Sequence, residues 1–208
     1  MRIIELHYLP SAAYIAQLHV YPDLHIDGYE HYVKQTYRNR CTILTANGLD
    51  ALSVPVVGSG KKIISKDIQI DHQQKWMNRH WRAIQSAYGR APYFEYYAEE
   101  YQAIMQKKHQ FLFDLSTEML TQCLENLQFN IQLRNTTSYV GIVEPPENDL
   151  RDRISTKTNP EELNLYKPVP YQQVFGSNFV NNLSILDLIF CEGPRSGDIL
   201  KAGIIKGT

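Results

Sequence analysis

Two apolar runs separated by Asn47 and Gly48 impose the strongest constraint on how this chain can fold. Cys41–Thr45 and Leu49–Val54 consist mostly of aliphatic or β-branched residues, and Ala46-Asn47-Gly48 lies between them. Asn-Gly is the dipeptide that most strongly favours a two-residue hairpin turn, because both residues tolerate positive φ. The sequence therefore predicts an antiparallel hairpin, with Asn47 and Gly48 in a tight turn and a positive φ at Gly48.

The first residues predict a strand followed by a helix. Ile3–Tyr8 has the character of a short buried strand that ends at Leu9-Pro10, and Ser11 is a candidate N-cap for a helix over Ala12–Leu18. Other stretches are expected to add strand or turn structure: Leu24–Val33, Ile63–Ile70 and Ile131–Val143.

Helical periodicity dominates the middle of the chain. From Gln73 to Tyr88 apolar residues recur at three- and four-residue intervals, and Gly89 ends the pattern. A longer helix, continuous or broken, is predicted from about Tyr97 to Leu127. Its apolar stripe is more typical of a core face than of a cofactor site. A capping box predicts another short helix, from Ser184 to about Phe190.

Together these elements predict an α/β fold. We expect a single domain over residues 1–208, with a mixed sheet that includes the Asn-Gly hairpin and with several helices packed on it. The polar, proline-punctuated stretch from Glu144 to Pro160 is expected to be a surface loop.

The charge balance argues against a nucleic-acid or membrane partner. The chain has 21 Lys and Arg against 22 Asp and Glu, which leaves a net charge of -1. Because no global field attracts a polyanion, any anion binding must be local. No stretch approaches the roughly 18 continuous apolar residues of a transmembrane helix, and the first residues do not match a secretory signal. We therefore expect a cytoplasmic protein without a membrane span.

Familiar cofactor and metal motifs are not matched. Gly58–Lys62 resembles an anion-binding loop, but a P-loop would need glycine in place of Pro55 and serine or threonine in place of Lys62. His72 and His80 share one face of a helix but lie two turns apart, roughly 12 Å by helical rise, which is too far for one ion. We therefore expect neither a metal nor a cofactor.

His7 is a candidate catalytic residue because it lies at the end of the first predicted strand. Open α/β sheets bind ligands beyond the carboxyl ends of their strands, and imidazole titrates near neutral pH. A histidine that only hydrogen-bonds the following loop explains the same position equally well.

The densest group of cations and tyrosines lies between Lys34 and Arg40. Arginine binds carboxylate or phosphate bidentately, so Arg38 and Arg40 are candidates for holding an anion, with Asn39 beside them. In an extended segment the two arginine side chains would point the same way. Replacing either by alanine should then weaken binding by roughly 1.5–3 kcal/mol and leave the fold intact. The alternative is a solvated strand edge protected by its charges.

Several short motifs follow one another along the chain. They are Leu9-Pro10 with Tyr14, Lys34 to Arg40, Val54-Pro55-Val56, Trp76, His80-Trp81, Tyr88 with Pro92-Tyr93-Phe94, Tyr171-Gln172-Gln173-Val174-Phe175, and Asn182-Leu183-Ser184-Ile185-Leu186-Asp187-Leu188. In this order they resemble the WbqC-like protein family over nearly the whole chain. Leu6-His7 departs from that family, which usually has Gln-Pro before the early Tyr-Leu-Pro.

The resemblance implies a function in bacterial surface-polysaccharide biosynthesis, because such proteins are associated with O-antigen and related gene clusters. The activity it implies is transfer of a glycyl, aminoacyl or other small acyl group to a sugar or sugar nucleotide, with His7 or His80 as general base. The residues that the resemblance implies to bind this small anionic substrate are Tyr14, Arg38, Asn39, Arg40, Trp76, Tyr171 and Gln172. The cations and tyrosines of the Lys34–Arg40 segment add Lys34 and Tyr37 to this prediction. The alternative is a non-catalytic protein that uses the same residues to bind a glycan precursor or a protein partner.

The spacing of the cysteines leads to a first testable prediction. Cys41, Cys123 and Cys191 are odd in number, widely spaced and without a CxxC pair, which favours reduced thiols. Titration of the protein with a thiol reagent, in denaturant and without reductant, should detect all three as free. Detection of a native disulfide would contradict both this prediction and the expected cytoplasmic location.

Overall fold

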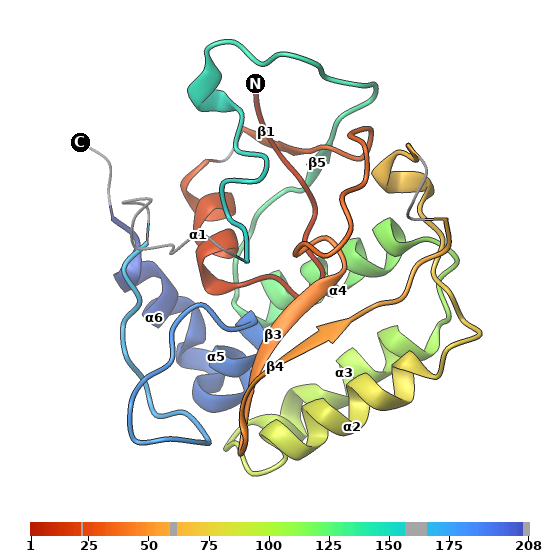
Figure 1. Ribbon diagram of the computed structural model, residues 1–208. Helices are drawn as coiled ribbons and strands as arrows, with labels where there is room; N and C mark the ends of the chain where they lie inside the picture. The colour runs from red at the N-terminus through yellow and green to blue at the C-terminus, as the bar shows by residue number, and fades with distance from the viewer. Residues whose placement is uncertain (22, 59–61, 157–165, 206–208) are drawn as a thin grey trace.

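The computed structural model describes residues 1–21, 23–58, 62–156 and 166–205 as a mixed α/β fold (Figure 1). Its strands are β1 (Arg2–Ile4), β2 (Leu24–Ile26), β3 (Arg40–Thr45), β4 (Gly48–Ser53) and β5 (Arg134–Asn135). Its α-helices are α1 (Ala12–Val20), α2 (Trp76–Tyr88), α3 (Phe94–Gln106), α4 (Leu112–Asn126), α5 (Ile185–Glu192) and α6 (Ser196–Gly203). Short 3-10 turns cover Ser65–Asp67, Pro146–Asn148 and Gly193–Arg195.

A small parallel sheet forms the upper part of the molecule in Figure 1. Its strand order is β1-β2-β5, with Ile4 opposite Ile26 and His25 opposite Arg134. A parallel bridge between Ile3 and Asp149 adds a further segment on the free side of β1. The residues that follow β1, β2 and β5 therefore meet at one edge of the sheet.

The predicted hairpin forms, but its turn differs from the prediction. β3 and β4 pair antiparallel, with Thr45 opposite Gly48, so the two turn residues are Ala46 and Asn47. Gly48 already belongs to β4 and has φ 102°. A glycine with positive φ directly after the turn is the pattern of the longer hairpin loops, in which only the glycine must adopt the left-handed conformation. The prediction of a turn centred on Asn47 and Gly48 is therefore wrong.

Other predicted elements are shorter than expected because long-range contacts replace ladder pairing. β1 ends at Ile4 rather than Tyr8, whose backbone N–H bonds to the carbonyl of Tyr37 at 2.9 Å. Ile63–Ile70 holds a 3-10 turn and only isolated bridges, and Ile131–Val143 contains only the two-residue β5. In the expected surface loop, residues 157–160 lie outside the described part of the chain, as do residues 59–61 of the glycine-containing loop.

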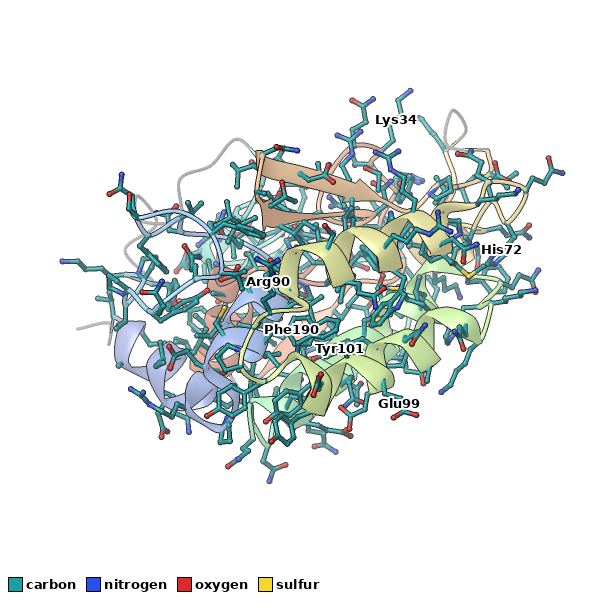
Figure 2. The ribbon with its side chains drawn as sticks, turned by 90° about the horizontal axis from the view of Figure 1, so that it is seen from below. Lys34, His72, Arg90, Glu99, Tyr101 and Phe190 are labelled. Carbon is teal, nitrogen blue, oxygen red and sulfur yellow. The ribbon has the colours of Figure 1, made fainter. Side chains whose placement is uncertain are left out.

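The helices form the main core. The long helix predicted in the middle of the chain is broken into α3 and α4, and Lys108 between them has φ 53°. In Figure 1 α2 and α3 lie below and to the right of the β3–β4 hairpin, α4 lies behind its upper end, and α5 and α6 lie to its left. Phe190 of α5 contacts the rings of Tyr88, Phe94 and Tyr101 at centroid distances of 5.5, 5.1 and 5.8 Å; Figure 2 places Phe190 beside Tyr101. The apolar stripes of the sequence are core, as predicted.

The cysteines agree with the first prediction. Cys41, Cys123 and Cys191 are all buried and unpaired. Burial raises the pKa of the Cys123 and Cys191 thiols to about 12, which keeps them protonated. None of the helices in the described ranges is long and apolar enough to cross a membrane.

The end of α5 provides a test of the packing. Gly193 has φ 53°, and a Cβ there would lie 2.4 Å from the ring of Tyr93. Gly193→Ala should therefore lower the free energy of unfolding by about 2–5 kcal/mol, from backbone strain and overpacking together. Gly48 has φ 102° and nothing within 4 Å of its Cβ position, so the matched control Gly48→Ala should cost only about 1–2 kcal/mol. Equal losses in urea unfolding would contradict the steric argument.

Candidate functional site

Buried polar side chains gather at the carboxyl edge of the parallel sheet. Glu5 and His7 follow β1, Asp27 and Glu30 follow β2, and Thr136 follows β5. All of them are buried, Glu5 and His7 to 1% exposure each. Buried polar groups must be satisfied by partners within the protein, so this edge is a compact polar network. It is also where open α/β sheets place their ligands.

Glu5 and His7 form a carboxylate–histidine pair at the centre of this network. His7 Nε2 lies 2.8 Å from Glu5 Oε1, and the imidazole stacks on the ring of Tyr14 at 4.3 Å. Tyr14 donates from its hydroxyl to the backbone carbonyl of Glu5 at 2.8 Å. Tyr37 lies on another side of the imidazole at 5.3 Å. The sequence predicted His7, Tyr14 and Tyr37 for the site, and the structure brings these three together.

Nδ1, the ring nitrogen of His7 that does not contact Glu5, determines what chemistry this residue can perform. Burial would raise the pKa of Glu5, but it is lowered by His7, through its charge when the imidazole is protonated and through its hydrogen bond, and by the charge of Arg38. An ionised Glu5 accepts a proton-bearing Nε2, which in a neutral imidazole leaves the lone pair on Nδ1. Nδ1 is buried and has no hydrogen-bond partner among the residues that the structure describes. It can therefore accept a proton from a group brought next to it.

Arg38 is buried beside this pair and held by carboxylates. Its Nε and Nη2 donate bidentately to Glu30 at 2.6 and 2.7 Å, and its Nη1 donates to Asp152 Oδ1 at 2.8 Å. Burial would lower the pKa of Arg38, but Glu30, Glu5 and Asp152 raise it, so the guanidinium is permanently charged. The fork predicted to hold a substrate anion is occupied here by the protein's own side chains.

A second arginine fastens the segment that covers the site. Arg151 donates to the buried Asp27 at 2.8 Å and to Asp149 at 2.6 Å. The next residue, Asp152, donates its backbone N–H to Glu5 Oε2 at 3.0 Å. The segment from Asp149 to Arg153 therefore lies across the end of β1 and covers Glu5.

Apart from Tyr37, the rest of the Lys34–Arg40 segment lies outside this network. Residues 34–39 form turns rather than the extended stretch considered above, and Arg38 is buried whereas Arg40 is half-buried. Lys34 is exposed at the outer edge of the molecule (Figure 2). Asn39 donates its side-chain amide to the carbonyl of Val54 at 3.0 Å, and Arg40 begins β3. Asn39 and Arg40 therefore belong to the hairpin, whereas Lys34 precedes it.

His80 lies in separate surroundings. Its Nδ1 accepts from the hydroxyl of Tyr8 at 3.2 Å, its Nε2 donates to the carbonyl of Ser53 at 3.1 Å, and Trp76 packs edge-on at 5.1 Å. With both ring nitrogens engaged, His80 links α2 to the end of β4. These contacts indicate a structural role for His80. They include neither Tyr14 nor Tyr37, the two aromatic residues that contact His7.

Tyr171 and Gln172 belong to a third region, near α5. Tyr171 donates its hydroxyl to the buried Asp187 at 2.6 Å. Gln172 lines a pocket of about 440 Å³ together with Arg90, Phe175 and Glu192. Of the predicted substrate-binding residues, Trp76, Tyr171 and Gln172 thus lie in contact groups different from that of His7.

Sequence reasoning missed the acidic half of the site. Glu5 lies inside the predicted strand Ile3–Tyr8, and Asp27 and Glu30 lie inside Leu24–Val33, whereas the strands end at Ile4 and Ile26. The rule that led to His7 applies to them only once these shorter strands are known. Asp152 could not be found in this way, because it lies 114 residues from Arg38 in the sequence. No group of three or more histidine, cysteine or acidic residues suited to a metal ion occurs within the described ranges.

Comparison with known proteins identifies relatives of the chain. The model of the WbqC-like protein family matches residues 7–162. The uncharacterized protein Rv1507c of Mycobacterium tuberculosis is 25% identical over 228 residues, which cover 96% of this chain and 96% of that protein. No solved structure matches the chain. The matched range contains His7, Arg38 and Asp152 but not Tyr171 or Gln172.

The surroundings of His80 predict a pH dependence of stability. Burial lowers the pKa of His80 from 6.5 to about 4. Between pH 6.5 and about 4, His80 binds a proton in the unfolded chain but not in the folded chain. Its contribution to the free energy of unfolding is therefore complete above pH 6.5 and is lost as the pH falls towards 4. The loss should amount to about 3 kcal/mol.

Unfolding by urea between pH 4 and 7.5 should measure this loss, and His80→Gln should remove it from the pH profile. Gln is suitable because its amide can both donate and accept. An unchanged slope in the variant would contradict the assignment of this loss to His80.

Proposed function

The chain belongs to the WbqC-like protein family, and we propose that it is a transferase that moves a glycyl, aminoacyl or other small acyl group onto a sugar or sugar nucleotide. The proposed setting is the cytoplasm, in a pathway that builds a bacterial surface polysaccharide. The observation that carries the proposal is the Glu5–His7 pair with its unpartnered Nδ1. This is a general base whose orientation is set by a carboxylate.

The proposed step needs one proton acceptor and one activated acyl donor, of the ester or thioester class. The acceptor amine or hydroxyl attacks the acyl carbon, and His7 Nδ1 takes the proton that the attacking atom loses. The bond between the acyl carbon and the donor's leaving group then breaks. The leaving group keeps the bonding electrons and receives the proton from His7, which returns to its neutral form.

The neighbouring residues support this role of His7. Glu5 lies behind Nε2 at 2.8 Å and would stabilise the imidazolium that forms when Nδ1 takes a proton. Stacking on Tyr14 at 4.3 Å limits rotation of the ring. Arg38 supplies a fixed positive charge next to Glu5, which can attract an anionic part of the substrate.

A non-catalytic binding protein is the second candidate function, and the closure of the site favours it. His7 is only 1% exposed, and the cavity lined by Leu6, Tyr32 and Arg38 has a volume of about 10 Å³. Such a volume holds about one water molecule and not a sugar. Catalysis on a sugar would require the site to open so that the sugar reaches His7, whereas a glycan precursor or a protein partner could bind at the surface without reaching His7.

The test is an acyl-transfer assay with purified protein, nucleotide-linked amino sugars, and thioesters of acetate and glycine. His7→Gln and Glu5→Gln should each lower kcat by about 10²–10⁴-fold, because they remove the base or its orienting carboxylate. The control His72→Gln changes an exposed histidine that bonds to the carbonyl of His109 and should retain full turnover. Circular dichroism should verify that the variants fold.

Two outcomes would contradict the transferase. Turnover that is unchanged in folded His7→Gln would remove His7 from the mechanism. Saturable binding of an amino-sugar nucleotide without any product, across the panel of donors, would favour the binding protein instead.

A further inference from the structure

The contact between Asp152 and Arg38 Nη1 differs from the other contacts of this arginine. Glu30 holds Nε and Nη2 bidentately, and its side chain is only 8% exposed. The side chain of Asp152 is 61% exposed, although it lies 2.8 Å from Nη1. Losing an exposed partner, whose charge water can solvate, costs much less free energy than losing a buried one. Asp152 is therefore the partner that another anion can replace.

The backbone contacts at Asp152 fix where its carboxylate lies. Its φ is 59°, in the left-handed region that Asp adopts more readily than most residues other than glycine. Hydrogen bonds hold the segment around this residue, from Arg151 to Asp27 and from the Asp152 N–H to Glu5. The carboxylate thereby reaches Nη1, the guanidinium nitrogen that Glu30 does not bind.

The charges around Arg38 limit which anion can take this place. Glu5 and Glu30 are both charge partners of Arg38, and Glu30 can accept two guanidinium hydrogen bonds only as a carboxylate. If Asp152 leaves and another carboxylate enters, the local charge does not change. A phosphate monoester carries about -1.5 to -2 at neutral pH and would add negative charge beside two buried carboxylates. A singly charged carboxylate is therefore preferred.

We propose that the side chain of Asp152 occupies the binding position of a substrate carboxylate on Arg38 Nη1, and that this exposed side chain turns away into solvent when that substrate binds. The inference rests on the proposed function for its assignment to substrate. Glu5 bonds to His7 through Oε1 and to the covering segment through Oε2, so a carboxylate in this position binds on the Glu5 side of the imidazole.

The test uses acetate as the probe, with Asp152→Gly as the main variant. Glycine removes the carboxylate and adopts positive φ without strain, so the fold should be retained. Acetate binding is followed by NMR through the arginine Nε–H signals. The apparent affinity for acetate should rise at least about tenfold over the wild type, since the competing side chain is gone. Inorganic phosphate should bind more weakly than acetate.

A second pair of variants separates local from general charge effects. Asp152→Asn removes the charge and retains the side-chain shape, and asparagine tolerates the left-handed backbone, so acetate binding should again rise. Glu147→Gln removes one charge from an exposed position in the same part of the chain and should leave acetate binding as in the wild type.

The inference is overturned if folded Asp152→Gly binds acetate no better than the wild type, if phosphate binds more tightly than acetate, or if Glu147→Gln matches Asp152→Asn. None of these measurements requires turnover. A protein that passes them but transfers no acyl group contradicts the proposed function alone. A protein that transfers acyl groups but fails them contradicts this inference alone.

Discussion

The buried ion pair between Arg38 and Glu30 is the interaction on which the rest of the site depends. It links the turn before β3 to the residues that follow β2, and its two partners are 8 positions apart in the sequence. Breaking such a pair by removing one partner costs about 3–5 kcal/mol, because it leaves an unpaired buried charge. Arg38→Ala would therefore damage the fold, contrary to the expectation from sequence that it would affect only binding. Substitutions of Asp152, which is exposed, probe the same guanidinium without that cost.

The helical part of the fold was the most accessible from sequence, because apolar periodicity depends on neighbours three and four positions apart. The same local rule placed α2 within a few residues and identified the core stripe of α4. Strand lengths were overestimated, because pairing depends on distant segments. Ile3–Tyr8 is apolar except at Glu5 and His7, yet only Arg2–Ile4 finds a ladder partner in β2. The hairpin turn shifted by one residue: Thr45 pairs with Gly48, whereas a turn at Asn47 and Gly48 would pair Ala46 with Leu49.

For the site, sequence identified residue types better than partners. His7 and Arg38 were singled out for their chemistry and position, and both lie in the polar network at the edge of the sheet. Their partners could not be derived in the same way. Asp152 meets Glu5 across 147 positions of sequence, and no local pattern encodes such a contact. Spacing also could not separate His80, whose two ring nitrogens are engaged by Tyr8 and Ser53.

The carboxylates around Arg38 determine which kind of anion this site suits. A cluster of cations in sequence suggests a pocket for polyphosphates, but here Glu5, Glu30 and Asp152 surround one guanidinium. Such surroundings disfavour a multiply charged anion, and in the exchange that we propose a single carboxylate takes the place of Asp152. One of these acidic residues, Glu5, also orients the imidazole of His7 through Nε2. Acid residues that look unfavourable for binding a sugar nucleotide are therefore favourable for a histidine base, provided that the nucleotide's phosphates bind elsewhere.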